Sequence, residues 1–176
     1  MSINGCEKLM LRLKNGDMSA FDKIYEQTNQ AVFFSALRIL RDRVRAEDIM
    51  QEVYINLIEK IALYNEGNAI GFLVTMAKRM ALNELKRAKR EVLTDYSEID
   101  FVDPRAFDGE VGSPLITLAM RVLEEDEFDI LSLAEISGYK RKEIAVILHI
   151  PISTVTYKYL RAIDKLKKNY EKEERQ

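Results

Sequence analysis

The chain has 176 residues, 47% of them hydrophobic and 32% charged, with a formal net charge of −2. This composition is typical of a folded soluble protein, the length allows one ordinary domain or two small ones, and no apolar run reaches the roughly 18–20 residues of a membrane span. The N-terminus has no apolar signal core, so we expect a cytoplasmic protein without membrane insertion. The single cysteine, Cys6, excludes an intramolecular disulfide. Because the chain also has only one histidine, a zinc site built from Cys and His is not expected.

The charge is unevenly distributed along the chain. Residues 72–90 carry a net charge of +5, residues 91–114 a net charge of −6, and residues 151–170 a net charge of +4. Basic segments that cluster in this way favour contact with a polyanion such as nucleic acid, which the small overall charge alone would not predict.

The N-terminal part of the chain has the hydrophobic spacing of helices. Residues 5–15 predict a short helix that Gly16 ends, and residues 20–41 keep a helical period of apolar positions. Asp42 is the expected N-cap of the next helix, because its side chain can accept a hydrogen bond from the first helical amides. The predicted fold class of the chain is all-α, with two small helical domains.

Residues 45–61 predict an amphipathic helix, and the rest of the interpretation depends on it. Ile49, Val53 and Ile61 form its buried stripe, with Met50, Leu57 and Ile58 beside them. Its other side carries four polar or acidic residues: Glu47, Asp48, Gln51 and Glu52. Acids near a helix N-terminus also suit the helix dipole, so an ordinary solvated face is the alternative interpretation.

A polar loop and a basic helix follow. Residues 64–71 contain two glycines and two asparagines, which is typical of a loop, and residues 72–90 predict a long helix. One side of that helix carries Arg79, Asn83, Lys86, Arg87 and Arg90. A dense cationic strip beside a polar loop favours contact with DNA or RNA phosphates, although a basic helix face can also be merely solvated.

Residues 91–114 contain two prolines and two glycines among seven acids, so we expect a linker between two domains. Residues 115–136 predict one or two helices, and Gly138 ends that run. Residues 140–148 predict a short helix. His149 then lies in a turn that needs a positive φ, and Ser153 is the expected cap of a last helix reaching about residue 170. Two helices joined by such a turn indicate a helix-turn-helix, with a plain helical hairpin as the alternative.

These motifs together resemble a known family. The pattern A-E-D-x-x-Q-E-x-aromatic at residues 46–54 resembles the helix by which bacterial sigma factors of the ECF (extracytoplasmic-function) group bind core RNA polymerase. Gly16-Asp17, the F-x-x-I-Y run at residues 21–25 and the basic helix resemble sigma region 2. Residues 123–145 and 148–162 resemble the two frames of sigma region 4. The order and spacing of all these motifs cover nearly the whole chain outside the linker.

The resemblance implies domains, roles and partners. It implies a region 2 domain at 1–90, an acidic linker at 91–114 and a region 4 domain at 115–176. Core polymerase would bind Glu47, Asp48, Gln51 and Glu52. The −10 promoter element would meet the 64–71 loop with Arg79, Asn83, Lys86, Arg87 and Arg90. The −35 element would meet Ser153, Thr154, Thr156, Tyr157, Lys158 and Arg161. An anti-sigma protein is a further expected partner, and no cofactor or metal is implied.

The chain departs from the family pattern at several positions. Phe72 stands where the family usually has Trp, and Arg79 and Asn83 stand where it has Asn and Asp. The family usually has Pro where this chain has Glu124, Gly where it has His149 and Ser153, and Lys where it has Thr156. Each replacement suits a helix or a turn, so we expect the fold to be unchanged and the promoter preference to be the chain's own.

Two other classes of function are alternatives to a sigma factor. An enzyme with metal held by Glu47, Asp48 and Glu52 is disfavoured, because helical carboxylate sites need a Glu-x-x-His or matching acids on a second helix. A helix-turn-helix regulator acting without polymerase explains residues 115–170 but not the region 2 pattern.

Overall fold

The computed structural model describes residues 3–94 and 113–173, and all of their regular structure is helical. The N-terminal part contains α1 (Ile3–Lys14), the short turn η1 (Met18–Ala20), α2 (Phe21–Leu40), α3 (Arg43–Lys60), η2 (Ile61–Leu63) and α4 (Ala69–Thr94). The C-terminal part contains α5 (Pro114–Val122), α6 (Glu125–Leu131), the π-helical turn η3 (Ser132–Ile136), α7 (Arg141–Leu148) and α8 (Ile152–Glu173). The predicted all-α architecture with two small domains is confirmed.

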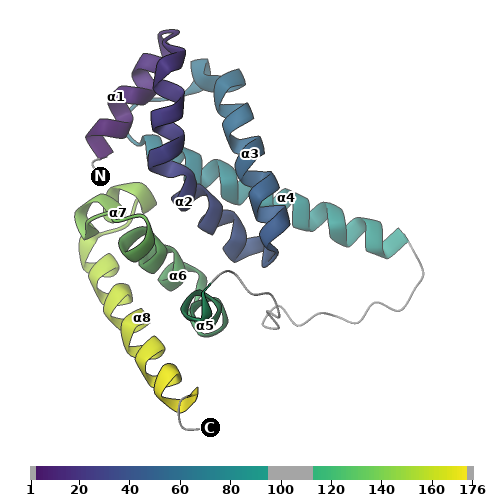
Figure 1. Ribbon diagram of the computed structural model, residues 1–176, viewed down its shortest axis with the longest axis vertical. Helices are drawn as coiled ribbons and strands as arrows, with labels where there is room; N and C mark the ends of the chain where they lie inside the picture. Colours follow the sequence, from purple (N-terminus) through teal and green to yellow (C-terminus); the bar gives the residue numbers. More distant parts are fainter. Residues whose placement is uncertain (1–2, 95–112, 174–176) are drawn as a thin grey trace.

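The first domain is a bundle built around α2. Helices α3 and α4 pack against α2, and α1 covers its N-terminal half (Figure 1). Inside the bundle the hydroxyl of Tyr54 donates to Thr28 Oγ1 at 2.8 Å, while Thr28 itself donates to Ile24 O at 2.7 Å. Both polar side chains are therefore satisfied although both are buried.

Local signals explain where these helices begin and end. Gly16, two residues after the end of α1, has a φ of +90°, a conformation that side chains disfavour. Asp42 accepts from Arg45 N at 3.1 Å, so the predicted N-cap of α3 is confirmed. Helix α4 is longer than predicted: it begins three residues before Phe72 and continues four residues beyond Arg90.

In the second domain, α6, α7 and α5 all pack against α8. The predicted helical stretch at 115–136 consists of α5, α6 and η3. Leu123 and Glu124 are extended and separate α5 from α6, and η3 follows α6 directly. His149 has the predicted positive φ, at 55°, and the chain turns there between α7 and α8. Ser153 was wrongly predicted as the cap of the last helix: α8 already begins at Ile152, directly after Pro151, and Ser153 lies inside it.

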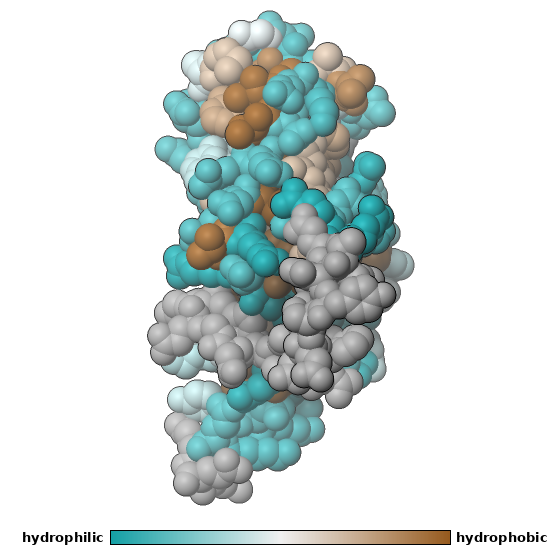
Figure 2. All heavy atoms as spheres, turned by 90° about the vertical axis from the view of Figure 1, so that its right-hand side faces the viewer, coloured by the Kyte–Doolittle hydropathy of each residue, from teal (hydrophilic) through white to brown (hydrophobic). Residues whose placement is uncertain are grey.

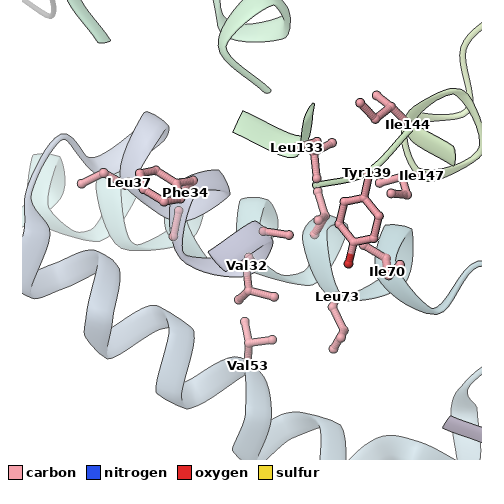
Figure 3. Packing of buried hydrophobic residues seen from close by; sticks show 14 of the residues in the cluster. Val32, Phe34, Leu37, Val53, Ile70, Leu73, Leu133, Tyr139, Ile144 and Ile147 are labelled. Carbon is pink, nitrogen blue, oxygen red and sulfur yellow. The ribbon is translucent and has the colours of Figure 1, made fainter. Parts of the chain in front are cut away.

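The two domains share a continuous hydrophobic core. Helices α2 and α4 contact α6, η3 and α7, and buried side chains from both domains form one cluster (Figure 3). None of the helices in the described part of the chain is both long and apolar enough to cross a membrane. Most of the predicted linker, residues 95–112, lies outside the described residues; residues 91–94 are the last turn of α4.

Candidate functional site

The exposed face of α3 carries the acidic residues that the sequence indicated. Asp48, Gln51 and Glu52 are exposed, while Ile49, Val53 and Leu57 on the opposite side are buried in the bundle. Glu47 differs from the other three because it is half-buried and its Oε1 accepts from Arg43 Nε at 2.9 Å. Three of the four predicted residues therefore share one open surface, and Glu47 lies at its edge.

Hydrophobic side chains on the same face were missed by the sequence interpretation. Val44 is 68% exposed, Ile55 57% and Ile58 41%, although Ile58 had been placed beside the buried stripe. The spacing 44, 48, 51, 55, 58 could have revealed them, since steps of four and three residues follow one side of a helix. Seen from the side of α3 and α4, hydrophobic side chains lie interspersed among hydrophilic ones over the upper part of the molecule (Figure 2).

The predicted loop at 64–71 is shorter than expected, because residues 69–71 already belong to α4; α1 holds this segment, still called the 64–71 loop, in place. Glu7 accepts from the Tyr64 hydroxyl at 2.6 Å, from Gly67 N at 2.9 Å and from Ala69 N at 3.0 Å. Lys14 donates to Tyr64 O at 2.8 Å. Burial and the adjacent Glu7 carboxylate raise the pKa of Tyr64, so its hydroxyl stays a donor. The loop is therefore preorganised by the first domain.

The loop and α4 border a groove with a volume of about 810 Å³, which we call the larger groove. Arg79 and Asn83 line it from α4, together with the hydrophobic side chains of Phe72, Met76 and Met80. Two residues of the second domain, Val146 and His149, line the same groove. A cavity with cations, an amide and flat apolar surface suits a nucleotide base beside its phosphate.

A smaller groove of about 370 Å³ separates α3 from α4. Asp48 and Glu52 line it from α3, and Asn83 and Arg87 line it from α4. The predicted core-binding and −10-binding residues are thus neighbours and not two distant sites. All five predicted residues of the basic strip on α4 are exposed: Arg79, Asn83, Lys86, Arg87 and Arg90.

The start of α8 presents the third set of predicted residues. Ser153 and Tyr157 are exposed, Tyr157 by 64%, and Thr154 and Thr156 are half-buried beside them. The two basic residues of this set are held by the neighbouring helix α6, as described next.

Helix α6 supplies carboxylates to the basic side of α8. Lys158 pairs with Asp126, and Arg161 Nε lies 3.1 Å from Glu127 Oε1. Lys165 Nζ donates to the other Glu127 oxygen at 2.6 Å. Burial alone would raise the pKa of Glu127, but the bonds from Lys165 and the Glu124 amide, together with Arg161, outweigh it and lower that pKa. Both predicted phosphate-binding residues are therefore oriented by acids before any DNA binds.

Within the described ranges no group of three or more His, Cys, Asp or Glu side chains is placed to hold a metal ion. Of the α3 carboxylates predicted to bind core polymerase, Asp48 and Glu52 are exposed, while Glu47 is half-buried.

The geometry combines a helix-turn-helix, an arrangement typical of DNA-binding proteins, with a second helical domain that carries an acidic and a basic surface. Comparisons with known proteins identify the family. Residues 24–91 match the model of sigma-70 region 2, and residues 114–166 match the model of sigma-70 region 4.

Curated relatives agree with these matches. The chain is 24% identical over 158 residues to the ECF RNA polymerase sigma factor SigK of Mycobacterium tuberculosis, covering 85% of this chain and 84% of that protein. It is 23% identical over 180 residues to the RNA polymerase sigma-H factor of Pseudomonas aeruginosa, covering 92% of both.

Solved structures share the fold. CnrH in complex with the cytosolic domain of CnrY superposes with a TM-score of 0.63 at 15% identity, covering 94% of this chain and 96% of that chain. The sigma factor RpoE in complex with the anti-sigma factor NepR, from Bartonella quintana, gives 0.58 at 21% identity, covering 84% and 94%.

The chain belongs to the ECF group of RNA polymerase sigma factors. It directs promoter recognition by RNA polymerase, so core polymerase and promoter DNA are its partners and it is not an enzyme. The match over residues 24–91 decides against a helix-turn-helix regulator that acts without polymerase.

Proposed function

We propose that three surfaces of this sigma factor divide its work. The exposed face of α3 binds core polymerase, the 64–71 loop with α4 binds the −10 element, and the start of α8 binds the −35 element. The first domain then spans residues 1–90, the linker 91–114 and the second domain 115–176. The juxtaposition of an exposed acidic helix with a basic groove carries this proposal.

The α3 face suits a partner with arginines. Exposed carboxylates form short, charge-assisted bonds with guanidinium groups, and such contacts at the centre of an interface are often worth about 2 kcal/mol or more on truncation. Glu52→Ala, and separately the double change of Asp48 and Gln51 to Ala, should weaken core binding without altering the helical circular dichroism. Wild-type affinity in both variants would remove α3 from the interface.

The larger groove and the basic strip suit an opened −10 element. Strand opening exposes bases that can leave the stack and enter a pocket, while cations alongside hold the phosphates. Replacing Lys86 and Arg87 with Ala should lower the salt slope of promoter binding by about 0.7–0.9 per lost contact. An unchanged slope would mean that these side chains are only solvated surface.

The start of α8 suits the major groove of a −35 duplex. The first residues of the second helix of a helix-turn-helix reach base edges, and later basic residues reach phosphates. We assign base edges or backbone to Ser153, Thr154, Thr156 and Tyr157, and phosphates to Lys158 and Arg161. Thr156→Lys should change the preferred −35 bases by about 1–3 kcal/mol per affected pair. Identical transcription of a randomised −35 library by both proteins would show that another element reads this box.

The acidic linker is proposed to mimic RNA. Its acids are repelled by DNA, and the resemblance implies a path through the polymerase channel that nascent RNA later takes; a tether that only sets the distance between the domains is the alternative. Neutralising Asp95, Glu98, Asp100 and Asp103 at fixed length should weaken core binding and alter the pattern of abortive transcripts. These residues lie outside the described part of the chain. No change in either measurement would favour the tether.

We further propose that an anti-sigma protein binds this chain and that it works in the cytoplasm, where the polymerase is. Two neighbours of similar fold were solved with CnrY and with the anti-sigma factor NepR, which supports the first proposal. A protein captured with the full chain from its own cells should displace core polymerase in a competition titration. A captured protein that leaves core binding unaffected would not be an anti-sigma factor. Cell fractionation tests the location: recovery of the chain in the soluble cytoplasmic fraction is expected.

A further inference from the structure

Helix α1 packs against η2 and α4, the elements that precede and follow the tip of the 64–71 loop. It lies outside residues 24–91, the part of the chain that matches region 2, so that match assigns it no role. Two of its side chains, Glu7 and Lys14, bond to the loop. They are seven residues apart and therefore lie on the same side of the helix.

The carboxylate of Glu7 holds the loop on both sides of its tip. Its Oε2 accepts from the Tyr64 hydroxyl at 2.6 Å, and its Oε1 accepts from Gly67 N at 2.9 Å. Between these two residues lie Asn65 and Glu66, which are exposed and line the larger groove. The carboxylate thus fixes the chain immediately before and immediately after the two side chains that the loop tip presents to the groove.

The same carboxylate caps the helix that carries the basic strip. Its Oε2 also accepts, at 3.0 Å, from the backbone N of Ala69, the first residue of α4. The first amides of a helix have no acceptor within that helix, and a negative charge there suits the helix dipole. Because α4 presents Arg79 and Asn83 to the larger groove, Glu7 links the position of the loop to the position of the helix beside it.

These bonds restrain the loop strongly because the acceptor is charged and partly shielded from water. Hydrogen bonds to a carboxylate are shorter and stronger than those between neutral groups. Glu7 is half-buried and Tyr64 is buried, so water competes for this cluster less than it would on an open surface. A pocket that exists for only a fraction of the time binds its ligand more weakly by that fraction, so a restrained loop raises the affinity for what it receives.

We propose that Glu7 is a positioning residue for −10 recognition: by holding Tyr64, Gly67 and Ala69, its carboxylate keeps the loop in the shape that receives an unstacked promoter base. This inference rests on the proposed assignment of the −10 element to the loop. Glu7 is not among the residues that line the larger groove, so it acts through the loop and not on the base. Its loss should reduce both the affinity for opened −10 DNA and the discrimination among bases.

Glu7→Gln tests this role at constant side-chain size. The amide has one oxygen where the carboxylate has two, so its NH2 group meets either the Gly67 N–H or the Ala69 N–H, and two donors cannot pair. The probe is a single-stranded oligonucleotide that the wild-type chain in complex with core polymerase selects from a randomised pool. If the released loop keeps its binding shape for about a tenth of the time, the variant complex should bind this probe about tenfold more weakly.

Base discrimination separates positioning from a purely structural role. Probes with one exchanged base bind through their phosphates, so Glu7→Gln should weaken them less, and the ratio of affinities between selected and exchanged probes should fall. Affinities for core polymerase and for a −35 duplex should stay at the wild-type level. A purely structural role would lower the melting temperature but leave the ratio of the folded variant unchanged, and that result would overturn the proposal.

Two companion variants make the test specific. Glu26→Gln makes the same chemical change at an exposed carboxylate of α2 and should keep wild-type affinity and discrimination; an equal loss there would refute a special role of Glu7. Tyr64→Phe removes one donor but leaves both backbone amides with their acceptor, so its loss should be smaller than that of Glu7→Gln. It also supplies the measurement if Glu7→Gln does not fold: discrimination at the wild-type level in Tyr64→Phe would then refute the proposal.

The basic strip distinguishes failure of this inference from failure of the −10 assignment. The variant with Lys86 and Arg87 changed to Ala is titrated with the same probe at several salt concentrations. If its salt slope falls while Glu7→Gln binds and discriminates as the wild type does, the −10 surface stands and Glu7 has no positioning role. If neither variant differs from the wild type, the −10 assignment fails and the inference falls with it. A loss of discrimination in Glu7→Gln supports the inference whichever slope the strip variant shows.

Discussion

Ile55 offers a sharp test of the α3 surface because it is hydrophobic, exposed and surrounded by the acids assigned to core polymerase. Fully burying an isoleucine is worth about 1.5–3 kcal/mol, and 57% of Ile55 is exposed in the free chain. Covering that fraction would contribute about 1–1.7 kcal/mol. Ile55→Ala should therefore weaken core binding by about 1 kcal/mol, or about fivefold in Kd.

Ile55→Ala should leave the free energy of unfolding unchanged within about 0.5 kcal/mol, because the substitution is on the surface. The assay is a competition titration of unlabelled variants against labelled wild type for core polymerase, at two salt concentrations. The loss from Ile55→Ala should persist at high salt because it is apolar, whereas the loss from Glu52→Ala should shrink through screening.

The matched control is Leu115→Ala on α5, where a leucine is 53% exposed on the other domain. It should bind core polymerase as the wild type does. Wild-type affinity of Ile55→Ala would refute the extension of the interface along α3. An equal loss in Leu115→Ala would show that exposed apolar area matters anywhere on the chain, and would equally refute the assignment.

Two further predictions concern stability. Glu127→Gln should destabilise the second domain by about 1–3 kcal/mol at neutral pH, because a charged acceptor for Lys165 and Arg161 is lost. Since folding lowers the pKa of Glu127, its stabilisation is fully present above the ordinary glutamate value of about 4.3 and is lost as the pH falls through the lower pKa of the folded state. Urea unfolding at pH 7 and at successively more acidic pH should therefore show a gap in stability between wild type and variant at pH 7 that narrows as the pH falls. In the first domain, Thr28→Val leaves the buried Tyr54 hydroxyl without its acceptor and should lower the free energy of unfolding by about 1–3 kcal/mol. Tyr54→Phe should lower it by less, because it removes the donor itself and leaves no hydroxyl unpaired. Equal melting temperatures for these two variants would contradict this account of the bond.

The sequence predicted the faces of helices better than their partners. Residue spacing placed Asp48, Gln51 and Glu52 on one side of α3, and backbone preferences placed Asp42 at a cap and His149 in a left-handed turn. Each of these depends on residues within one or two helical turns, where spacing alone determines the geometry.

Contacts between distant residues could not be predicted in this way. Nothing in the spacing of residues 151–170 indicates that α6 supplies acids to Lys158 and Arg161, because that depends on how two helices pack. The contact between Lys78 and Asp129 joins two domains across 51 residues, and charge patterns alone leave its partner open. The exposed hydrophobic residues of α3 are different: their spacing was available, and the error was to place Ile58 beside the buried stripe.

Departures from the family pattern show how local losses are offset. Where the family has a proline, which lacks an amide hydrogen, Glu124 introduces a donor, and Glu127 Oε2 accepts from it at 3.0 Å within the same domain. Where the family has glycine, His149 adopts a φ of 55° that a side chain disfavours, and its ring lies 3.1 Å from Asn68 of the other domain. The first compensation survives any movement of the domains. The second exists only while the two domains are in contact, because the ring of His149 and the side chain of Asn68 belong to different domains.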